Sequence, residues 1–202
     1  MKKYLTLSLL AIGLTLASCD SKSSLAKDMS GSWAGAPERI NSPQTAATIT
    51  CTDTYDFIEE TGIAGGNVTI AGMMSVSAPM LSSGDTGGYS ISAAANTTIS
   101  GTWTVTDEDE VEMILDPRSL TVNIDPDALE LRTDSLGVQA PQVDSIAPGL
   151  TDRLRQLLTG VMEEHYLSQR HLDDVEVSDN VLKFDVETPK AKDKKIVLRR
   201  QQ

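Results

Sequence analysis

Apolar residues recur at every second position along most of this 202-residue chain, and this alternation is the feature that most constrains its fold. The clearest run covers residues 47–58, where Ile49, Cys51, Tyr55 and Phe57 fall on one face of a strand. Strands with one apolar face must bury that face against another sheet, or against their own sheet closed on itself. The pattern therefore predicts a mainly β protein and favours a buried, inert thiol at Cys51.

Glycine, aspartate, asparagine or proline separates successive alternating runs, as in an antiparallel meander of about eight to ten strands. A meander of this size closes readily into an up-and-down barrel. No periodicity is visible over residues 132–148, and we predict a long loop there. From Leu150 to Met162 the apolar residues instead fall at helical spacing, which predicts one late amphipathic helix. The expected strands are 32–40, 47–58, 67–80, 89–100, 101–106, 111–115, 120–124 with 129–131 as its continuation, 175–177, 182–186 and 195–199.

The first eighteen residues have the pattern of an export signal. Two lysines precede an apolar run over residues 5–16, which is too short to span a membrane stably. The run ends in Leu16-Ala17-Ser18-Cys19, which resembles the lipobox of bacterial lipoproteins. The resemblance implies cleavage before Cys19 and lipidation of its thiol, and several acyl chains on one residue hold a protein firmly to a bilayer. We predict a signal peptide at 1–18 and a lipidated cysteine with a polar tether at 19–28; an ordinary signal peptide with a chance cysteine is the alternative.

The charge excludes one class of partner. The chain has 17 basic and 29 acidic residues, a net charge of −12. Cleavage before Cys19 would remove two lysines and no acidic residue, which leaves a net charge of −14. Binding to nucleic acid needs a basic surface, so we exclude it.

The lipobox-like segment also predicts where the protein lies. We predict a lipid-anchored protein of the Gram-negative cell envelope, at the outer membrane. Its periplasmic or surface face stays open, and Asp20 would favour the inner membrane in enteric bacteria.

Two short motifs add a family resemblance. Gly31-Ser32-Trp33 resembles the Gly-x-Trp signature on the first strand of lipocalin-like barrels. Gly101-Thr102-Trp103, followed by the acidic turn at 107–110, is similar to a mid-barrel segment of lipocalin-like bacterial lipoproteins. The resemblance implies a lipocalin-like β-barrel domain over residues 29–202 with Trp33 packed over one end. It leaves open whether the interior is a ligand cavity or is filled by side chains.

Motifs for catalysis or metal binding are weak. Residues 84–88, Gly-Asp-Thr-Gly-Gly, resemble the nucleophile segment of chymotrypsin-like proteases, but no histidine precedes them as that mechanism requires, so we interpret them as a turn. His165 and His171 lie among four carboxylates and are candidate zinc or copper ligands. Their spacing places them about 120° apart around a helix, so they would meet only if the helix ended between them. A solvated helix end is the preferred interpretation.

Two serines in the expected loop are candidate modification sites. Asp134-Ser135-Leu136 and Asp144-Ser145-Ile146 resemble the acceptor pattern of a periplasmic O-glycosylation system in some Gram-negative anaerobes. Ordinary loop serines at Ser135 and Ser145 are the alternative.

The anchor, the strand pattern and the lack of a catalytic set predict a non-catalytic binding or interaction module. Such a module would carry a small apolar ligand or contact an envelope protein, and we expect it to need no cofactor. The first alternative is a solidly packed structural or assembly subunit. The second is a metal-assisted enzyme that uses His165 and His171.

Overall fold

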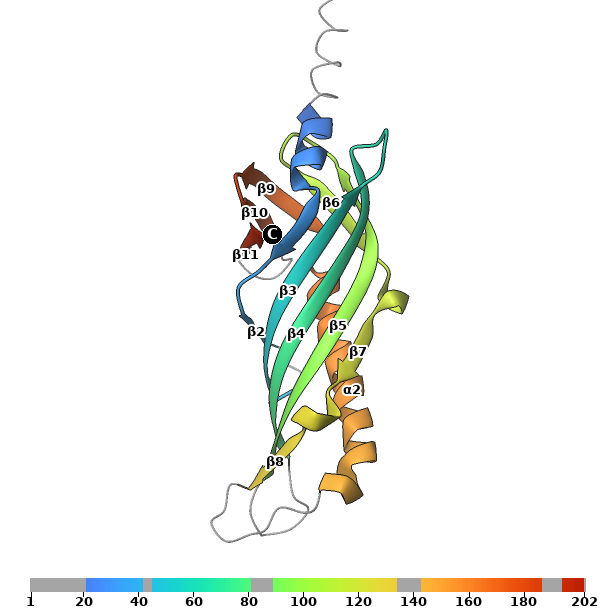
Figure 1. Ribbon diagram of the computed structural model, residues 1–202, viewed down its shortest axis with the longest axis vertical. Coiled ribbons are helices and arrows are strands. Elements are labelled where there is room, and N and C mark those ends of the chain that lie inside the picture. Colours follow the sequence, from blue (N-terminus) through green and yellow to red (C-terminus); the bar gives the residue numbers. More distant parts are fainter. Residues whose placement is uncertain (1–20, 42–44, 81–88, 134–142, 187–193, 202) are drawn as a thin grey trace, which may run out of the picture.

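The computed structural model describes residues 21–41, 45–80, 89–133, 143–186 and 194–201. In this part of the chain, eight antiparallel strands close into a barrel, because β1 pairs with β3 on one side and with β11 on the other (Figure 1). The barrel strands are β1 (Gly31–Ala34), β3 (Thr48–Glu59), β4 (Gly65–Met80), β5 (Tyr89–Val105), β6 (Val111–Leu115), β9 (His171–Ser178), β10 (Val181–Val186) and β11 (Lys194–Arg200). The prediction of a mainly β, up-and-down barrel is confirmed.

The longest strands extend beyond the closed barrel. Residues 101–105 of β5 pair with β6, whereas residues 89–98 of the same strand pair with β7 (Thr121–Ile124) and β8 (Glu130–Thr133). The helix α2 (Val143–Leu167) lies along this extension and contacts β7 (Figure 1). Its apolar stripe is buried, as the helical spacing predicts, and includes Leu154, Leu158, Val161 and Met162. The helix therefore covers the long strands where β9, β10 and β11 do not reach.

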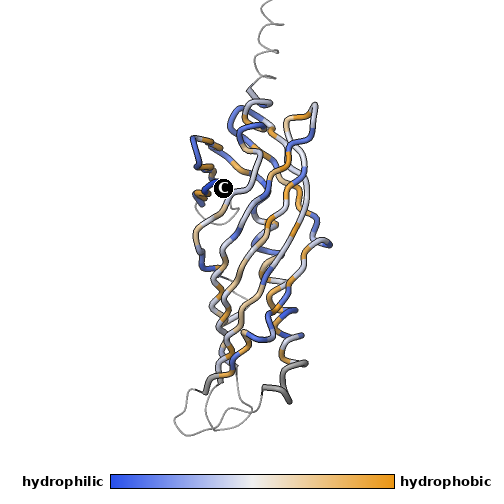
Figure 2. The backbone as a smooth tube through the Cα atoms, viewed as in Figure 1, coloured by the Kyte–Doolittle hydropathy of each residue, from blue (hydrophilic) through white to orange (hydrophobic). Residues whose placement is uncertain are grey.

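Aromatic side chains fill the barrel interior. Tyr55, Phe57, Trp103 and Phe184 are almost completely buried. The rings of Phe57 and Trp103 meet edge to face with centroids 5.3 Å apart, and those of Tyr55 and Phe184 do so at 6.2 Å. Such pairs stabilise a core beyond the area that they bury. The alternating hydropathy that produces this one-sided burial is visible along the strands in Figure 2.

Trp33 is fully buried beside the chain segment that precedes the barrel. Its indole Nε1 donates to the carbonyl of Met29 at 2.7 Å, and the guanidinium of Arg200 lies 4.1 Å above the ring centroid. Met29 and Ala26 are also fully buried, on a helix that includes residues 21–29. A polar tether was expected at residues 19–28, and the structure differs from this. Ala26 and Met29 are spaced three apart, so they share a helical face that packs on the core.

Three further differences concern element boundaries. The single strand expected at 32–40 is split into β1 and β2 (Glu38–Ile40), since Pro37 has no N–H to donate to a strand ladder. Strands expected at 89–100 and 101–106 form one strand, β5, because Gly101 lets the backbone of β6 approach closely. The predicted loop at 132–148 is wrong in its second part, where α2 already begins at Val143. Pro148 is the sixth residue of α2, so it does not mark the start of the helix.

The remaining elements are two short 3-10 helices, Pro117–Ser119 and Pro126–Ala128, which connect β6, β7 and β8. Among the helices of the described residues, none is both long enough and apolar enough to cross a membrane.

Candidate functional site

Three neighbouring strands interrupt their apolar inner faces at the same level. Asp53 on β3 pairs with Gly72 on β4, and Gly72 pairs with Thr97 on β5. Asp53 is only 9% exposed and Thr97 only 2%, so both side chains are directed into the protein. A buried carboxylate is costly unless it is paired and hydrogen-bonded. This polar row therefore needs partners from elsewhere in the chain.

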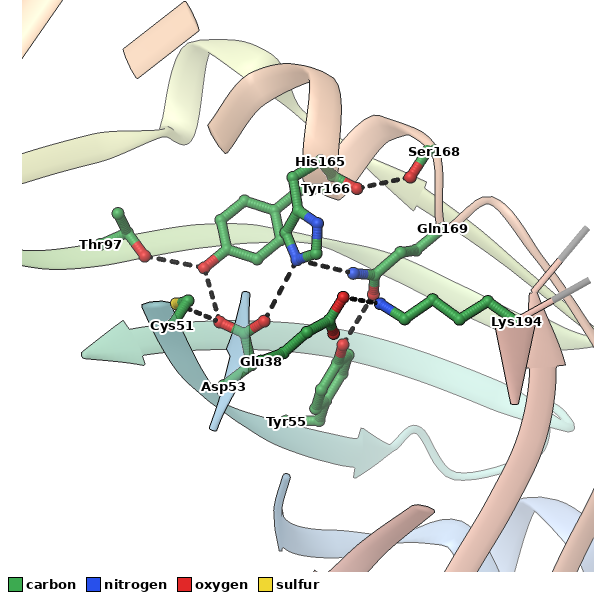
Figure 3. Close-up of polar contacts among 10 residues, drawn as sticks. All are labelled: Glu38, Cys51, Asp53, Tyr55, Thr97, His165, Tyr166, Ser168, Gln169 and Lys194. Carbon is green, nitrogen blue, oxygen red and sulfur yellow. Dashed lines mark hydrogen bonds and ion pairs between the residues drawn. The ribbon is translucent and has the colours of Figure 1, made fainter. Parts of the chain in front are cut away.

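The last turn of α2 supplies a tyrosine to the polar row (Figure 3). The Tyr166 hydroxyl donates to Oδ1 of Asp53 at 2.9 Å and lies 2.7 Å from Oγ1 of Thr97. A Cβ atom at Gly72 would lie 2.6 Å from the Tyr166 hydroxyl oxygen, closer than real Cβ contacts allow. The missing side chain at Gly72 thus makes room for the tyrosine and seats the helix end on the sheet.

Histidine and glutamine side chains complete the network. Nε2 of His165 lies 3.3 Å from Oδ2 of Asp53 and 3.2 Å from the amide nitrogen of Gln169. Oε1 of Gln169 accepts from the Tyr55 hydroxyl at 2.7 Å, and the Cys51 thiol donates to Oδ1 of Asp53 at 3.1 Å. Figure 3 shows Cys51, His165 and Tyr166 around the Asp53 carboxylate, with Thr97 of β5 bonded to Tyr166 and Gln169 bonded to His165.

The environment sets the protonation of this network. Burial alone would raise the pKa of Asp53, but the hydrogen bond and charge of His165, with the hydrogen bonds from Cys51 and Tyr166, outweigh it and lower the pKa. Burial, and next the charge of Asp53, raise the pKa values of Cys51, Tyr55 and Tyr166. At neutral pH the centre is therefore an ionised carboxylate surrounded by protonated donors, and the buried thiol of Cys51 agrees with the sequence prediction.

A cleft opens on the side of the barrel beside this network. β1 pairs with β11 through Trp33–Arg200 and Ala34–Arg199, and the chain then turns away so that β2 pairs with β3. Residues 35–38 and 194–198 form two walls of a cleft of about 350 Å³. Its floor includes the Cys51, Asp53 and Tyr55 side chains of the network. This volume is at the lower end of the range for sites that bind small molecules.

An ion pair crosses the cleft. The ammonium of Lys194 on β11 contacts Oε1 of Glu38 on β2, and the two side chains are 38% and 40% exposed (Figure 3). Both residues also line a second hollow of about 410 Å³, together with Glu164, His165 and Ser168. The ion pair is therefore a shared boundary of two hollows, the second of which lies against the end of α2.

The structure places the two candidate metal ligands differently. His165 belongs to the network, whereas His171 is exposed at the start of β9, opposite Glu112 on β6. Within the described residues, no group of three or more histidine, cysteine, aspartate or glutamate side chains is placed to hold a metal ion.

Other predicted features lie partly outside the described residues. Cys19, Ser135 and the turn at 84–88 are not among them. Ser145 lies on α2, so it is in a helix where a loop was expected.

The sequence reasoning did not identify Asp53, Gly72 or Thr97. Their signal was the interruption of the apolar alternation on three consecutive strands.

No protein-family model matches this chain, and no curated protein matches it. The geometry of the cleft and its network is therefore the basis for a functional proposal.

Proposed function

We propose that this protein is a lipid-anchored, non-catalytic binding module of the bacterial cell envelope that takes a small ligand in the cleft between β2 and β11. The observation that carries the proposal is the cleft, which has an open mouth and a buried, hydrogen-bonded floor. The interior of the barrel is a poorer candidate, since Phe57, Trp103 and Phe184 fill it. The ligand site thus lies on the side of the barrel and not along its axis.

The network favours binding over catalysis. Histidine and a carboxylate together can act as a general base on a nucleophile. Here the Cys51 thiol donates to Asp53 and not to His165, and its pKa is raised, so the contacts do not activate it. The hydrogen bonds of Asp53 instead tie β3 to the helix end and keep the cleft floor in a fixed shape. A pre-formed floor lowers the entropy lost when a ligand binds.

Anchoring rests on the lipobox-like Leu16-Ala17-Ser18-Cys19. Residues 21–29 are helical and pack on the barrel, so a lipid at Cys19 would hold the barrel close to the membrane surface, which we place at the outer membrane. Metabolic labelling with a radioactive fatty acid tests this part. Label should enter the wild-type chain and be absent from Cys19→Ser, and equal labelling of both would refute the anchor.

The ligand site is tested with a library of small fragments and the full-length chain purified in detergent. We expect some fragments to raise the thermal midpoint of the wild type. Ala36→Trp fills the cleft from its wall and should abolish this effect, whereas Ala71→Trp, on the exposed outer face of β4, should retain it.

Two results would contradict the cleft as the binding site. Stabilisation that survives in Ala36→Trp would place the ligand elsewhere on the protein. The absence of any stabilising fragment would favour the packed structural or assembly subunit, which the filled barrel interior also supports.

A further inference from the structure

We infer that the ligand of the cleft carries a carboxylate, which binds Lys194 in the place that Glu38 occupies. This inference rests on the proposed function and adds the chemical class of the ligand. In the structure the cleft already holds one carboxylate against the Lys194 ammonium, but that carboxylate belongs to the protein itself. Glu38 is thus an internal substitute for the anionic group of the ligand.

The Glu38–Lys194 pair can be exchanged at little cost. Both side chains are more than one-third exposed, and ion pairs at such sites add little to stability. Glu38 also belongs to a strand of only three residues, which pairs with β3 through residues 38–40. Its side chain can therefore turn to solvent while the barrel strands keep their pairing. A ligand carboxylate would then take over the contact with Lys194.

The local charge favours an anion over a cation. The Asp53 carboxylate is already matched by donors of its own chain, among them His165 and Tyr166. Lys194 is the cation that faces Glu38 in the first hollow, whereas Lys195 points to the other face of β11 and lies opposite Asp185 of β10. A cationic ligand would have to displace the Lys194 ammonium from Glu38 and remain beside it.

The wider charge distribution points the same way. The described strands β10 and β11 carry five lysine or arginine residues and one aspartate, although the chain from Cys19 onward has a net charge of −14. These two strands are thus basic in an otherwise acidic molecule. A local positive potential raises the concentration of anions at the cleft and speeds their association.

The remaining walls suit an apolar group attached to the carboxylate. Ile196 of β11 lines the cleft on one side, and Ala36 and Pro37 line it on the other. Ile196 is half-buried and Ala36 and Pro37 are exposed, so all three present apolar surface to a ligand. A compact organic acid would place its carboxylate at Lys194 and its hydrocarbon part against these three side chains.

Three matched probes test the inference with the full-length chain. Cyclohexanecarboxylate, cyclohexylmethylamine and cyclohexylmethanol share one ring and differ in the charge of the polar group. We expect the carboxylate to bind at least about tenfold more tightly than the other two, measured as dissociation constants by amide NMR titration. Lys194→Gln should weaken carboxylate binding by about tenfold. Glu38→Gln should strengthen it by a few fold, because the internal competitor is lost.

A second exposed ion pair provides the control. Lys183 contacts Glu176 at 3.7 Å and does not line the cleft, so Lys183→Gln removes the same charge and should leave binding unchanged. If the amine or the alcohol binds as tightly as the carboxylate and Ala36→Trp abolishes that binding, the carboxylate inference is overturned while the binding function stands. If none of the three probes binds but library fragments do, the same conclusion holds. If no compound of either set binds, both proposals fail.

Discussion

Replacing Gly72 with alanine tests the central structural feature of the site, the contact between the end of α2 and the polar row. A Cβ atom there would lie 2.5 Å from Oγ1 of Thr97, 2.6 Å from the Tyr166 hydroxyl oxygen and 2.8 Å from Oδ1 of Asp53. All three atoms belong to buried, hydrogen-bonded side chains. The added methyl group must therefore push at least one of them out of the network.

The magnitude follows from two effects. Forcing one extra carbon into a packed core costs about 1–3 kcal/mol. Leaving a buried hydrogen-bonding group without its partner costs about 1–3 kcal/mol more. We expect Gly72→Ala to lower the free energy of unfolding by about 3 kcal/mol, a large share of the stability of a typical domain.

Urea denaturation followed by tryptophan fluorescence measures this change, with the free energy taken by linear extrapolation. Gly160→Ala is the matched control, because Gly160 lies exposed on α2 and an added Cβ meets no atom within 4 Å. The control should gain up to about 1 kcal/mol from helix propensity. A loss below about 0.5 kcal/mol in Gly72→Ala would show that Tyr166 does not occupy the space above Gly72, and would refute the reasoning.

Three other predictions concern the same core. The pKa of Asp53 is lower in the folded than in the unfolded chain. Its ionised form therefore stabilises the fold, fully so above the ordinary aspartate pKa of about 4. This stability is lost as the pH falls through the folded-state pKa. The difference in unfolding free energy between wild type and Asp53→Asn should therefore shrink on acidification, and a difference that grows would contradict the network. The Cys51 thiol should resist Ellman's reagent in the native protein and react fully in guanidinium chloride, whereas fast native labelling would show an open floor. Arg200→Ala should lose about 1–2 kcal/mol through its stacking on the Trp33 ring, and the exposed neighbour Arg199→Ala should lose much less by the same denaturation assay.

The fold was predictable because its signal is local. Alternation with a period of two marks a strand wherever it occurs, and the stripe from Leu150 to Met162 marks a helix in the same way. The errors arose where a residue type has two meanings. Pro37 separates two strands and Pro148 lies within a helix, and Gly101 allows close packing within β5.

The site was not predictable by the same means, because it depends on register. Asp53, Gly72 and Thr97 become neighbours only through the pairing of β3 with β4 and of β4 with β5. Tyr166 then joins them from a helix more than a hundred residues away from Asp53 along the chain. Single polar residues on apolar faces do carry a signal, but its meaning requires knowledge of which positions face one another.

The cleft between β2 and β11 is the centre of this account, and amide chemical-shift mapping tests it most directly. The isotope-labelled full-length chain is titrated with the fragment that stabilises it most. We predict that the shifted amides concentrate at residues 35, 36, 38 and 194–198 of the cleft walls, where Pro37 has no amide proton. Shifts confined to the barrel interior, at the indoles of Trp33 and Trp103, or to the outer face of β4 would contradict the account.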